Sequence, residues 1–427
     1  MKRRYGLTPA VRRPMRFCRE HILTVGCWLA VGTCVASAAG RQYVLFNRMP
    51  GPAWKQARPQ SFTPEGFEEV KRAVGDDGSG MIRVGVAFIF SPLASEPTTV
   101  VRSLEAFLGC AERTDTPVVV QLDLENWWGH RSDLWNWWDP NAPGYDLANR
   151  YNVEWTDWSP ENAVRICWRN WGRQIRVLPQ PNLMSERYLA ACRQEVRRLV
   201  PVVLRWHEGL PPEKKGLLVG IKVGHETSIG VNAWHYPGGN VLLGKPALQD
   251  RTTGLDGERV PDRGVAQMGY AAVRTAGIRS SGRITEADIV EVCKRYLEVL
   301  CEEAATCGVK REMLFTHGAG WRDGEMLYDA AVNRYSCPGW SFYRHAGDPK
   351  ADSGIQRNLA RMDAPYWAAA EWLYQGPRQT DAWEKALHNT LGDSRCRYVC
   401  IYNWEGVRDS QETIAAVRRM IGAGGNR

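Results

Sequence analysis

Short apolar runs alternate with amphipathic segments from residue 40 to the end of the chain. Eight of the runs have the length and the β-branched and aromatic content of strands. They cover residues 43–46, 82–90, 118–125, 217–226, 313–317, 339–343, 366–372 and 397–404. Eight strands that alternate with helices predict an α/β fold, specifically a (β/α)8 TIM barrel, in which reactive groups gather at the carboxyl ends of the strands.

Helices are predicted between these strands from start signals and from apolar residues at helical spacing. Thr63, Ser185 and Thr285 each stand where a helix N-cap belongs. Further helices are predicted over residues 98–112, 324–335, 354–362, 381–391 and 410–421. An open doubly wound sheet is the alternative, but it would want a glycine-rich turn after the first strand, and the segment NRMPGPAW lacks one.

Two connections are many times longer than the usual 4–6 residues. One follows the third strand over about sixty residues, and the other occupies residues 227–285 after the fourth strand. Both leave the carboxyl ends of their strands. We therefore expect these loops to form the walls of a cleft at the mouth of the barrel.

The first 39 residues differ from the rest of the chain. Seven basic residues precede an apolar run over residues 22–38 that ends in small residues, which is typical of an export signal cleaved near Ala38 or Ala39. A retained membrane anchor is the alternative. We predict an exported protein, periplasmic or extracellular, in which residues 40–427 form a single catalytic domain.

Charge and cysteine content exclude several function classes. The leader has seven basic residues and one acidic residue, so six of the eight net positive charges lie in it, and the basicity of the chain does not indicate nucleic acid. No glycine-rich phosphate loop follows a strand. The nine cysteines after the leader lack CxxC spacing, which argues against a zinc site or a redox dithiol, and their odd number leaves at least one thiol free.

Nine of the nineteen tryptophans lie between Trp127 and Trp171, in the long loop after the third strand. Indole rings gathered in one polar loop favour flat faces held toward a ligand, and sugars fit because their C–H faces stack on indoles. Asn126, Trp127 and Trp128 begin this loop at the rim and are the first candidates for substrate contact. A self-packed surface loop with its own small core is the alternative.

Strand alternation indicates which polar residues point into the barrel mouth. In the fourth strand, Val219, Ile221 and Val223 form the face toward the helices, so Lys222 and Glu226 point inward, with Glu226 at the rim.

In the third strand, alternation sends Gln121, Asp123 and Glu125 to the inside. Burying these three polar side chains costs free energy unless they have partners, and Lys222 on the neighbouring strand is the expected partner.

The last two strands supply a second carboxylate and aromatic side chains. In the seventh strand Trp367 and Glu371 share the inward parity, and the alanines between them leave room for a ligand. In the eighth strand Tyr402 and Trp404 look inward, while Glu405 is turned aside and is only a reserve nucleophile. By this alternation, Glu226 and Glu371 are the two carboxylates best placed to face each other across the barrel mouth.

Two carboxyls across a cleft can divide the work of glycoside cleavage, one as an acid and one as a nucleophile or base. A glutamate ending strand four, another ending strand seven and a tryptophan at the end of strand eight resemble the retaining glycoside hydrolases of clan A, the 4/7 superfamily of (β/α)8 barrels. The resemblance implies that Glu226 in KVGHETS is the acid/base, Glu371 in AAAEWLY the nucleophile, and Trp404 in YNWEG the floor of the subsite. It also implies a carbohydrate substrate and no cofactor.

One departure from the clan A pattern concerns the residue before the acid/base. Members usually carry Asn there to hold the sugar 2-hydroxyl, and this chain has His225. The resemblance therefore gives that role to His225. His317, at the end of strand five, is expected either to contact sugar or to orient a carboxylate.

Two other function classes stay open. His130, His225, His317 and Asp123 lie near strand ends and would suit a metal-dependent barrel hydrolase, but such enzymes carry an HxH pair in the first strand, and YVLFNRM has no histidine. The other class is a sugar-binding barrel that kept its tryptophans and lost its acids. Both glutamates remain in this chain, which favours the enzyme.

Overall fold

The fold is seen in a computed structural model that describes residues 40–51, 54–76, 78, 80–170, 174–230, 233–234, 267–320 and 323–423. Contacts divide the chain into Met1–Ser37 and Ala38–Arg427, and all described residues lie in the second unit. The predicted export signal lies outside the described residues, as does most of the loop after the fourth strand. Within the described part, no helix combines the length and apolar character that a membrane crossing requires.

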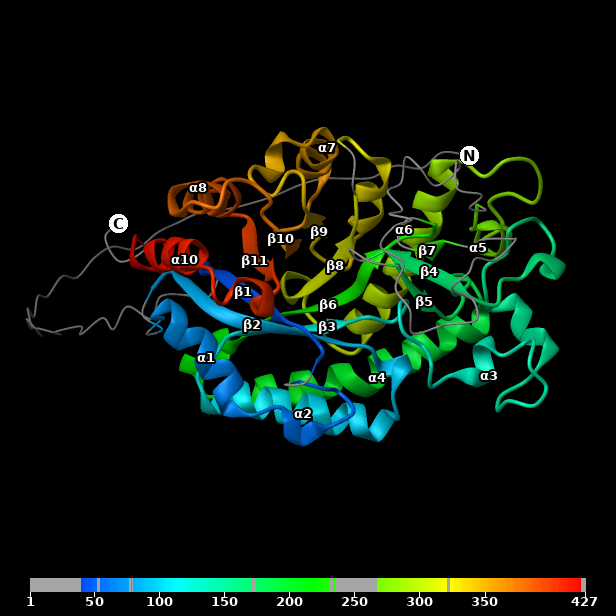
Figure 1. Cartoon of the computed structure of the whole chain (residues 1–427), viewed down its shortest axis with the longest axis horizontal. Coiled ribbons are helices and arrows are strands. Elements are labelled where there is room, and N and C mark those ends of the chain that lie inside the picture. Colours follow the sequence, from blue (N-terminus) through cyan, green and yellow to red (C-terminus); the bar gives the residue numbers. More distant parts are fainter. Residues whose placement is uncertain are drawn as a thin grey trace, which may run out of the picture. The chain divides into compact units, whose positions relative to one another are not determined.

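Eight parallel strands close into a barrel (Figure 1). They are β1 (Gln42–Arg48), β2 (Ile82–Phe90), β3 (Val118–Leu122), β6 (Leu218–Thr227), β8 (Leu314–Gly318), β9 (Gly339–Phe342), β10 (Trp367–Trp372) and β11 (Cys396–Tyr402). Each strand pairs with the next, and β11 closes on β1 with Val399 opposite Val44. All eight predicted strands and the closed barrel are confirmed, and the doubly wound sheet is excluded.

Helices follow the strands and surround the barrel, with α2 and α4 lying along β2 and β3 in Figure 1. The longer ones are α1 (Pro64–Val74), α2 (Pro97–Arg113), α4 (Glu186–Gly209), α6 (Glu286–Thr306), α7 (Ser353–Arg361), α8 (Thr380–Leu391) and α10 (Gln411–Ala423). Ser185 caps α4, and Thr285 forms a capping box with Asp288 at the start of α6. Shorter elements are α3 (Ser132–Trp135), α5 (Tyr270–Thr275), α9 (Trp404–Val407) and a sheet of β4 (Cys167–Asn170), β5 (Gln174–Val177) and β7 (Ala233–Trp234).

One predicted helix was wrong. Residues 324–335 form only the 3-10 helix η9 (Met326–Ala331). The side chain of Asn333 accepts hydrogen bonds from the backbone N–H groups of Tyr335 and Ser336. This local turn competes with helical hydrogen bonding and ends the segment early.

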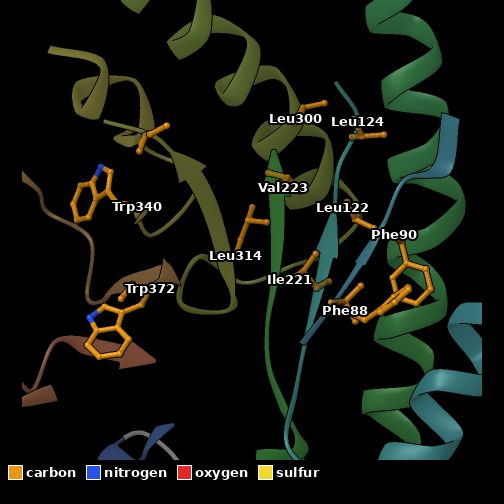
Figure 2. Close-up of a cluster of buried hydrophobic side chains, with 14 of the residues drawn as sticks. Phe88, Phe90, Leu122, Leu124, Ile221, Val223, Leu300, Leu314, Trp340 and Trp372 are labelled. Carbon is orange, nitrogen blue, oxygen red and sulfur yellow. The ribbon is translucent and has the colours of Figure 1, made fainter. Parts of the chain in front are cut away.

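Two hydrophobic layers hold the barrel. The outer layer lies between strands and helices, where Figure 2 shows Leu122 and Ile221 on the neighbouring strands β3 and β6. The inner layer fills the barrel toward the amino ends of its strands with residues such as Tyr43, Val119 and Phe315. This packed interior closes one end of the cylinder, so that only the carboxyl end is left to accept a ligand.

Register shifts correct part of the predicted alternation. β3 pairs Val118 with Leu218 but Val119 with Gly220, so Val219 belongs to the inner layer and not to the helix-facing side. Shifts on both sides of β10 likewise turn Trp367 into the outer layer. Bulges of this kind re-aim the side chains that follow them, and alternation alone could not foresee them.

The nine described cysteines are all free thiols, and eight of them are buried. Burial raises the pKa of the Cys192 thiol to about 12, so it remains protonated and behaves as an apolar core group. The prediction of a free thiol is confirmed.

Candidate active site

A cavity of about 1340 Å³ lies at the carboxyl ends of the strands. Its walls come from β2, β6, β10 and β11 and from the segments that follow β1, β2, β3, β8, β9 and β10. The lining includes Gln56, Asp123, Trp127, His225, Glu226, Tyr328, Tyr343, Arg344, His345, Glu371, Tyr402 and Asn403. The volume exceeds the range of about 300–1,000 Å³ that small-ligand pockets span, so the cavity has room for an extended ligand.

Glu226 reaches this cavity through an unusual backbone. Gly224 has φ 80° and Glu226 has φ 52°, both in the left-handed region, which a non-glycine residue adopts only at a cost. These two residues break the alternation of β6, so that His225 and Glu226 both line the cavity. A strained residue that is also a buried carboxylate is typical of a functional site.

Glu226 and Glu371 meet at one hydroxyl group. Tyr343 lies within hydrogen-bond reach of Oε1 of Glu226, and its hydroxyl is 2.7 Å from Oε1 of Glu371. Two hydrogen bonds of at most about 3.0 Å leave the nearest oxygens of the two carboxyls no more than about 6 Å apart. The pairing predicted from strand parity is therefore present in the fold.

The contacts of Tyr343 imply that the pair holds a proton. A phenol has one proton to donate, so it can donate to only one of the two carboxyls. The other contact is satisfied when that carboxyl is protonated and donates to the phenol oxygen. Burial and then the charge of Glu226 raise the pKa of Glu371 to about 8, in agreement with one proton shared by the pair at neutral pH.

A chain of hydrogen bonds reaches Glu226 from inside the barrel. The ammonium of Lys222 lies 2.5 Å from Nδ1 of His317, whose Nε2 lies 2.8 Å from the hydroxyl of Ser341. Ser341 donates to Oε1 of Glu226 over 2.8 Å. Lysine can only donate, so His317 accepts at Nδ1 and donates at Nε2. Each donor in this series of hydrogen bonds therefore points toward the carboxylate of Glu226.

Lys222 is wholly buried, and burial lowers its pKa to about 8, although the nearby charge of Glu371 opposes that shift. Its ammonium also lies 3.2 Å from Nδ1 of His225. The charges of Asp123 and Glu125 also act on Lys222, as predicted for their countercharge, but its hydrogen bonds go to the two histidines.

Asp123 and Glu125 have different surroundings. Asp123 lines the cavity and accepts hydrogen bonds from the backbone N–H groups of Glu125 and Asn126. Glu125 lies behind the cavity wall and accepts from the N–H of His225 at 2.8 Å and from the Thr227 hydroxyl. Burial and the neighbouring Asp123 raise the pKa of Glu125 to about 7. Glu125 therefore supports the bend in β6 that presents Glu226.

The tryptophan-rich loop fits the alternative prediction, that of a surface loop with a small core of its own. Trp127 lines the cavity and is 36% exposed, whereas Trp128 is buried at 1% and donates its indole N–H to the carbonyl of Pro179. Other indoles of the loop also bond to backbone carbonyls, namely Trp135, Trp137, Trp155 and Trp158. Among the loop tryptophans whose side chains the structure describes, the others pack within the loop or against neighbouring elements and do not line the cavity.

Several expected substrate contacts lie elsewhere. Trp367 is wholly buried beside Phe342 in the outer layer. Trp404 is 1% exposed and packs edge-on against Phe46, with ring centroids 5.1 Å apart, because it already belongs to α9. The aromatic residue that the last strand brings to the cavity is Tyr402.

Other candidates stand behind or beside the cavity. Asn126 does not line it and donates its side-chain N–H to the carbonyl of His225. His317 is wholly buried and holds Ser341, which fits the orienting role and not sugar contact. Glu405 pairs with Arg48 at 3.1 Å, outside the cavity wall, so the reserve nucleophile is not at the site.

Sequence reasoning missed Ser341 and Tyr343. Both lie on the inward side of the β9 segment GWSFY, since Trp340 and Phe342 belong to the outer layer. The alternation of that strand could have placed both side chains in the barrel mouth. Charged residues and tryptophans were the main candidates, so these two hydroxyl groups were missed.

The metal-dependent alternative does not fit this site. Three ligand atoms, one each from His225, His317 and Glu371, lie within 4.8 Å of one another, but the ammonium of Lys222 is hydrogen-bonded to Nδ1 of both histidines. A cation held among these atoms would meet that positive charge. His130 is exposed and does not line the cavity.

The site is thus a paired-carboxylate centre at the mouth of a (β/α)8 barrel. No protein-family model and no curated protein sequence matches the chain. Among solved structures, it is similar to a GH5-4 broad-specificity endoglucanase from an uncultured bacterium, with TM-score 0.43 and 7% identity over 90% of this chain and 94% of that chain. It is also similar to the catalytic domain of the Bacillus sp. JAMB-750 GH26 endo-β-1,4-mannanase, with TM-score 0.45 and 11% identity over 91% and 87%.

A third match is a Bacteroidetes-affiliated GH5 cellulase linked with a polysaccharide utilization locus, with TM-score 0.42 and 12% identity over 92% of this chain and 94% of that chain. At these identities and scores, the matches carry no argument about the activity of this chain. The function is therefore argued from the geometry of the site.

Proposed function

We propose that this protein is an exported glycoside hydrolase that cleaves an oligo- or polysaccharide with retention of configuration. Glu226 is the general acid/base, and Glu371 is the nucleophile. The observation that carries the proposal is the contact of both carboxyls with the hydroxyl of Tyr343 inside a cavity large enough for an extended ligand. No cofactor takes part.

The short distance between the carboxyls supports retention. Retaining enzymes place their two carboxyls about 5–5.5 Å apart, whereas inverting enzymes need about 6.5–9.5 Å to admit a water. The upper limit of about 6 Å that the shared hydroxyl of Tyr343 sets lies below the inverting range. Glu371 then attacks the anomeric carbon, and the glycosidic bond breaks as Glu226 protonates the leaving oxygen. Water later releases the sugar, with Glu226 acting as base.

Tyr343 gives the pair a route for its proton. The donor from Ser341 favours an ionised Glu226 in the resting site, with the shared proton on Glu371. When Glu371 gives this proton to the phenol oxygen, Tyr343 passes its own proton to Glu226. The result is an ionised nucleophile and a protonated acid, with no net change of charge. Bound sugar, which excludes water from Glu226, favours this second arrangement.

The test uses Glu226→Gln and Glu371→Gln with aryl glycosides of graded leaving-group pKa. Glu371→Gln removes the nucleophile and should abolish cleavage of all of them. Glu226→Gln should slow poor leaving groups by about 10²–10⁴ and good ones much less, because only poor leaving groups need protonation. Glu405→Gln, in the Arg48 ion pair, is the matched control.

Equal and mild losses in both variants would show that the pair is misassigned. A third outcome identifies the sugar-binding alternative. In that case oligosaccharide affinity would be unchanged in Glu371→Gln, and neither form would show turnover.

A further inference from the structure

Two buried polar atoms beside the cavity face each other without a hydrogen bond. Oδ2 of Asp352 and Nε2 of His345 are 3.8 Å apart, and neither has a hydrogen-bond partner among the described residues. Asp352 is wholly buried. Buried polar groups are nearly always satisfied, so an orphan pair of this kind needs an explanation.

A third ligand atom stands next to this pair. Oδ1 of Asp323 lies 3.9 Å from Nε2 of His345, and the three side chains offer ligand atoms that all lie within 4.8 Å of one another. These separations are too long for direct hydrogen bonds. Ligand atoms at about 2.0–2.2 Å from one tetrahedral zinc are about 3.3–3.6 Å apart, so each carboxylate oxygen needs to approach His345 by only a few tenths of an ångström to share an ion with it.

We propose that Asp323, His345 and Asp352 bind a divalent first-row transition-metal ion of the zinc type. One imidazole and two carboxylates match the ligand preference of such ions, whereas calcium prefers oxygen ligands only. Oδ1 of Asp352 accepts from the N–H groups of Gly354 and Ile355 at the start of α7, which holds that carboxylate in place and leaves Oδ2 to the ion.

The ion would connect three segments at the mouth of the barrel. Asp323 follows β8, His345 follows β9, and Asp352 begins α7. His345 lines the cavity and lies two residues beyond Tyr343. The ion therefore fixes the loop after β9 against its neighbour. The site is separate from the Glu226–Glu371 pair and does not depend on the proposed hydrolysis.

The experiment measures metal binding to the full chain after treatment with a chelator. Zn²⁺ is titrated by calorimetry, and Co²⁺ is titrated by its visible absorption, which reports coordination by protein ligands. One ion per chain is expected. At a Zn²⁺ concentration about 100-fold above Kd, the Tm should rise by about 3 °C.

Variants locate the ion. His345→Gln should weaken binding by more than the roughly 10- to 100-fold that the loss of an outer-shell partner costs. Asp352→Asn keeps the capping oxygen and removes the charge, and Asp323→Asn serves as a second variant at a half-exposed residue if Asp352→Asn does not fold. His388→Gln is the control, because His388 faces only Glu384 across 3.8 Å on the surface of α8.

Unchanged binding in His345→Gln, or no ion bound to the wild type, would overturn the proposal. Loss of binding in Glu371→Gln, with His345→Gln unaffected, would also overturn it and would place the ion among His225, His317 and Glu371 instead. Binding of Ca²⁺ in preference to Zn²⁺ would contradict the ligand chemistry proposed here.

Discussion

The tryptophan-rich loop and the carboxylate pair differ in how closeness along the sequence relates to closeness at the candidate site. The loop gathers nine tryptophans within forty-five residues, yet of those with described side chains only Trp127 lines the cavity. Glu226 and Glu371 lie 145 residues apart along the chain, yet they touch the same hydroxyl. Residues close in sequence satisfy one another locally, whereas the ends of parallel strands must converge.

The neighbours Trp127 and Trp128 give the sharpest test of this difference. Trp128→Ala should lower the free energy of unfolding by about 3–5 kcal/mol, because it empties a fully buried indole site and leaves the carbonyl of Pro179 without its donor. Chemical denaturation measures the loss. A loss below about 1 kcal/mol would mean that the loop has no core of its own.

Tyr343→Phe tests the carboxylate side of the comparison. It removes the hydroxyl that both carboxyls share, and we expect kcat to fall about 10- to 100-fold, or ~1.4–2.7 kcal/mol, with little change in fold. Tyr328→Phe is the matched control, since Tyr328 lines the same cavity but donates to the carbonyl of Gly320. Equal effects of the two variants would remove Tyr343 from the mechanism.

The pH profile reports the shared proton. The pair should be active while it holds one proton, so kcat/KM should fall as the pH rises through about 8, the raised pKa of Glu371. Lys222→Met removes a positive charge that favours ionised Glu371, so it should move this alkaline limb upward by about one pH unit. Lys214→Met, which contacts the carbonyl of Glu112, is the control. A downward shift in Lys222→Met would contradict this assignment.

The smallest effect is expected at Trp127. Trp127→Ala should raise KM about tenfold while the free energy of unfolding stays within about 0.5 kcal/mol, because its ring is partly exposed toward the cavity. Stacking that buries about 50 Å² of apolar area accounts for a change of that size. An unchanged KM would mean that the whole loop is structural and that the sugar stacks elsewhere.

The sequence predicted the barrel well because strand and helix periodicities repeat eight times, and errors in one element do not disturb the others. It predicted that Glu226 and Glu371 lie close together because both stand near the carboxyl ends of their strands. It misplaced Val219, Trp367 and Trp404, since bulges and the early start of α9 change the direction of side chains without any mark in the hydrophobic pattern.

The left-handed backbone at Glu226 also limits how far the protein can be stabilised against heat without loss of this glutamate. Glycine and asparagine adopt this conformation at lower cost, by about 1–2 kcal/mol. In a library of variants selected for heat resistance alone, glycine or asparagine should therefore become enriched at position 226. Such variants would be more stable than the parent protein at high temperature but would lack the proposed acid/base.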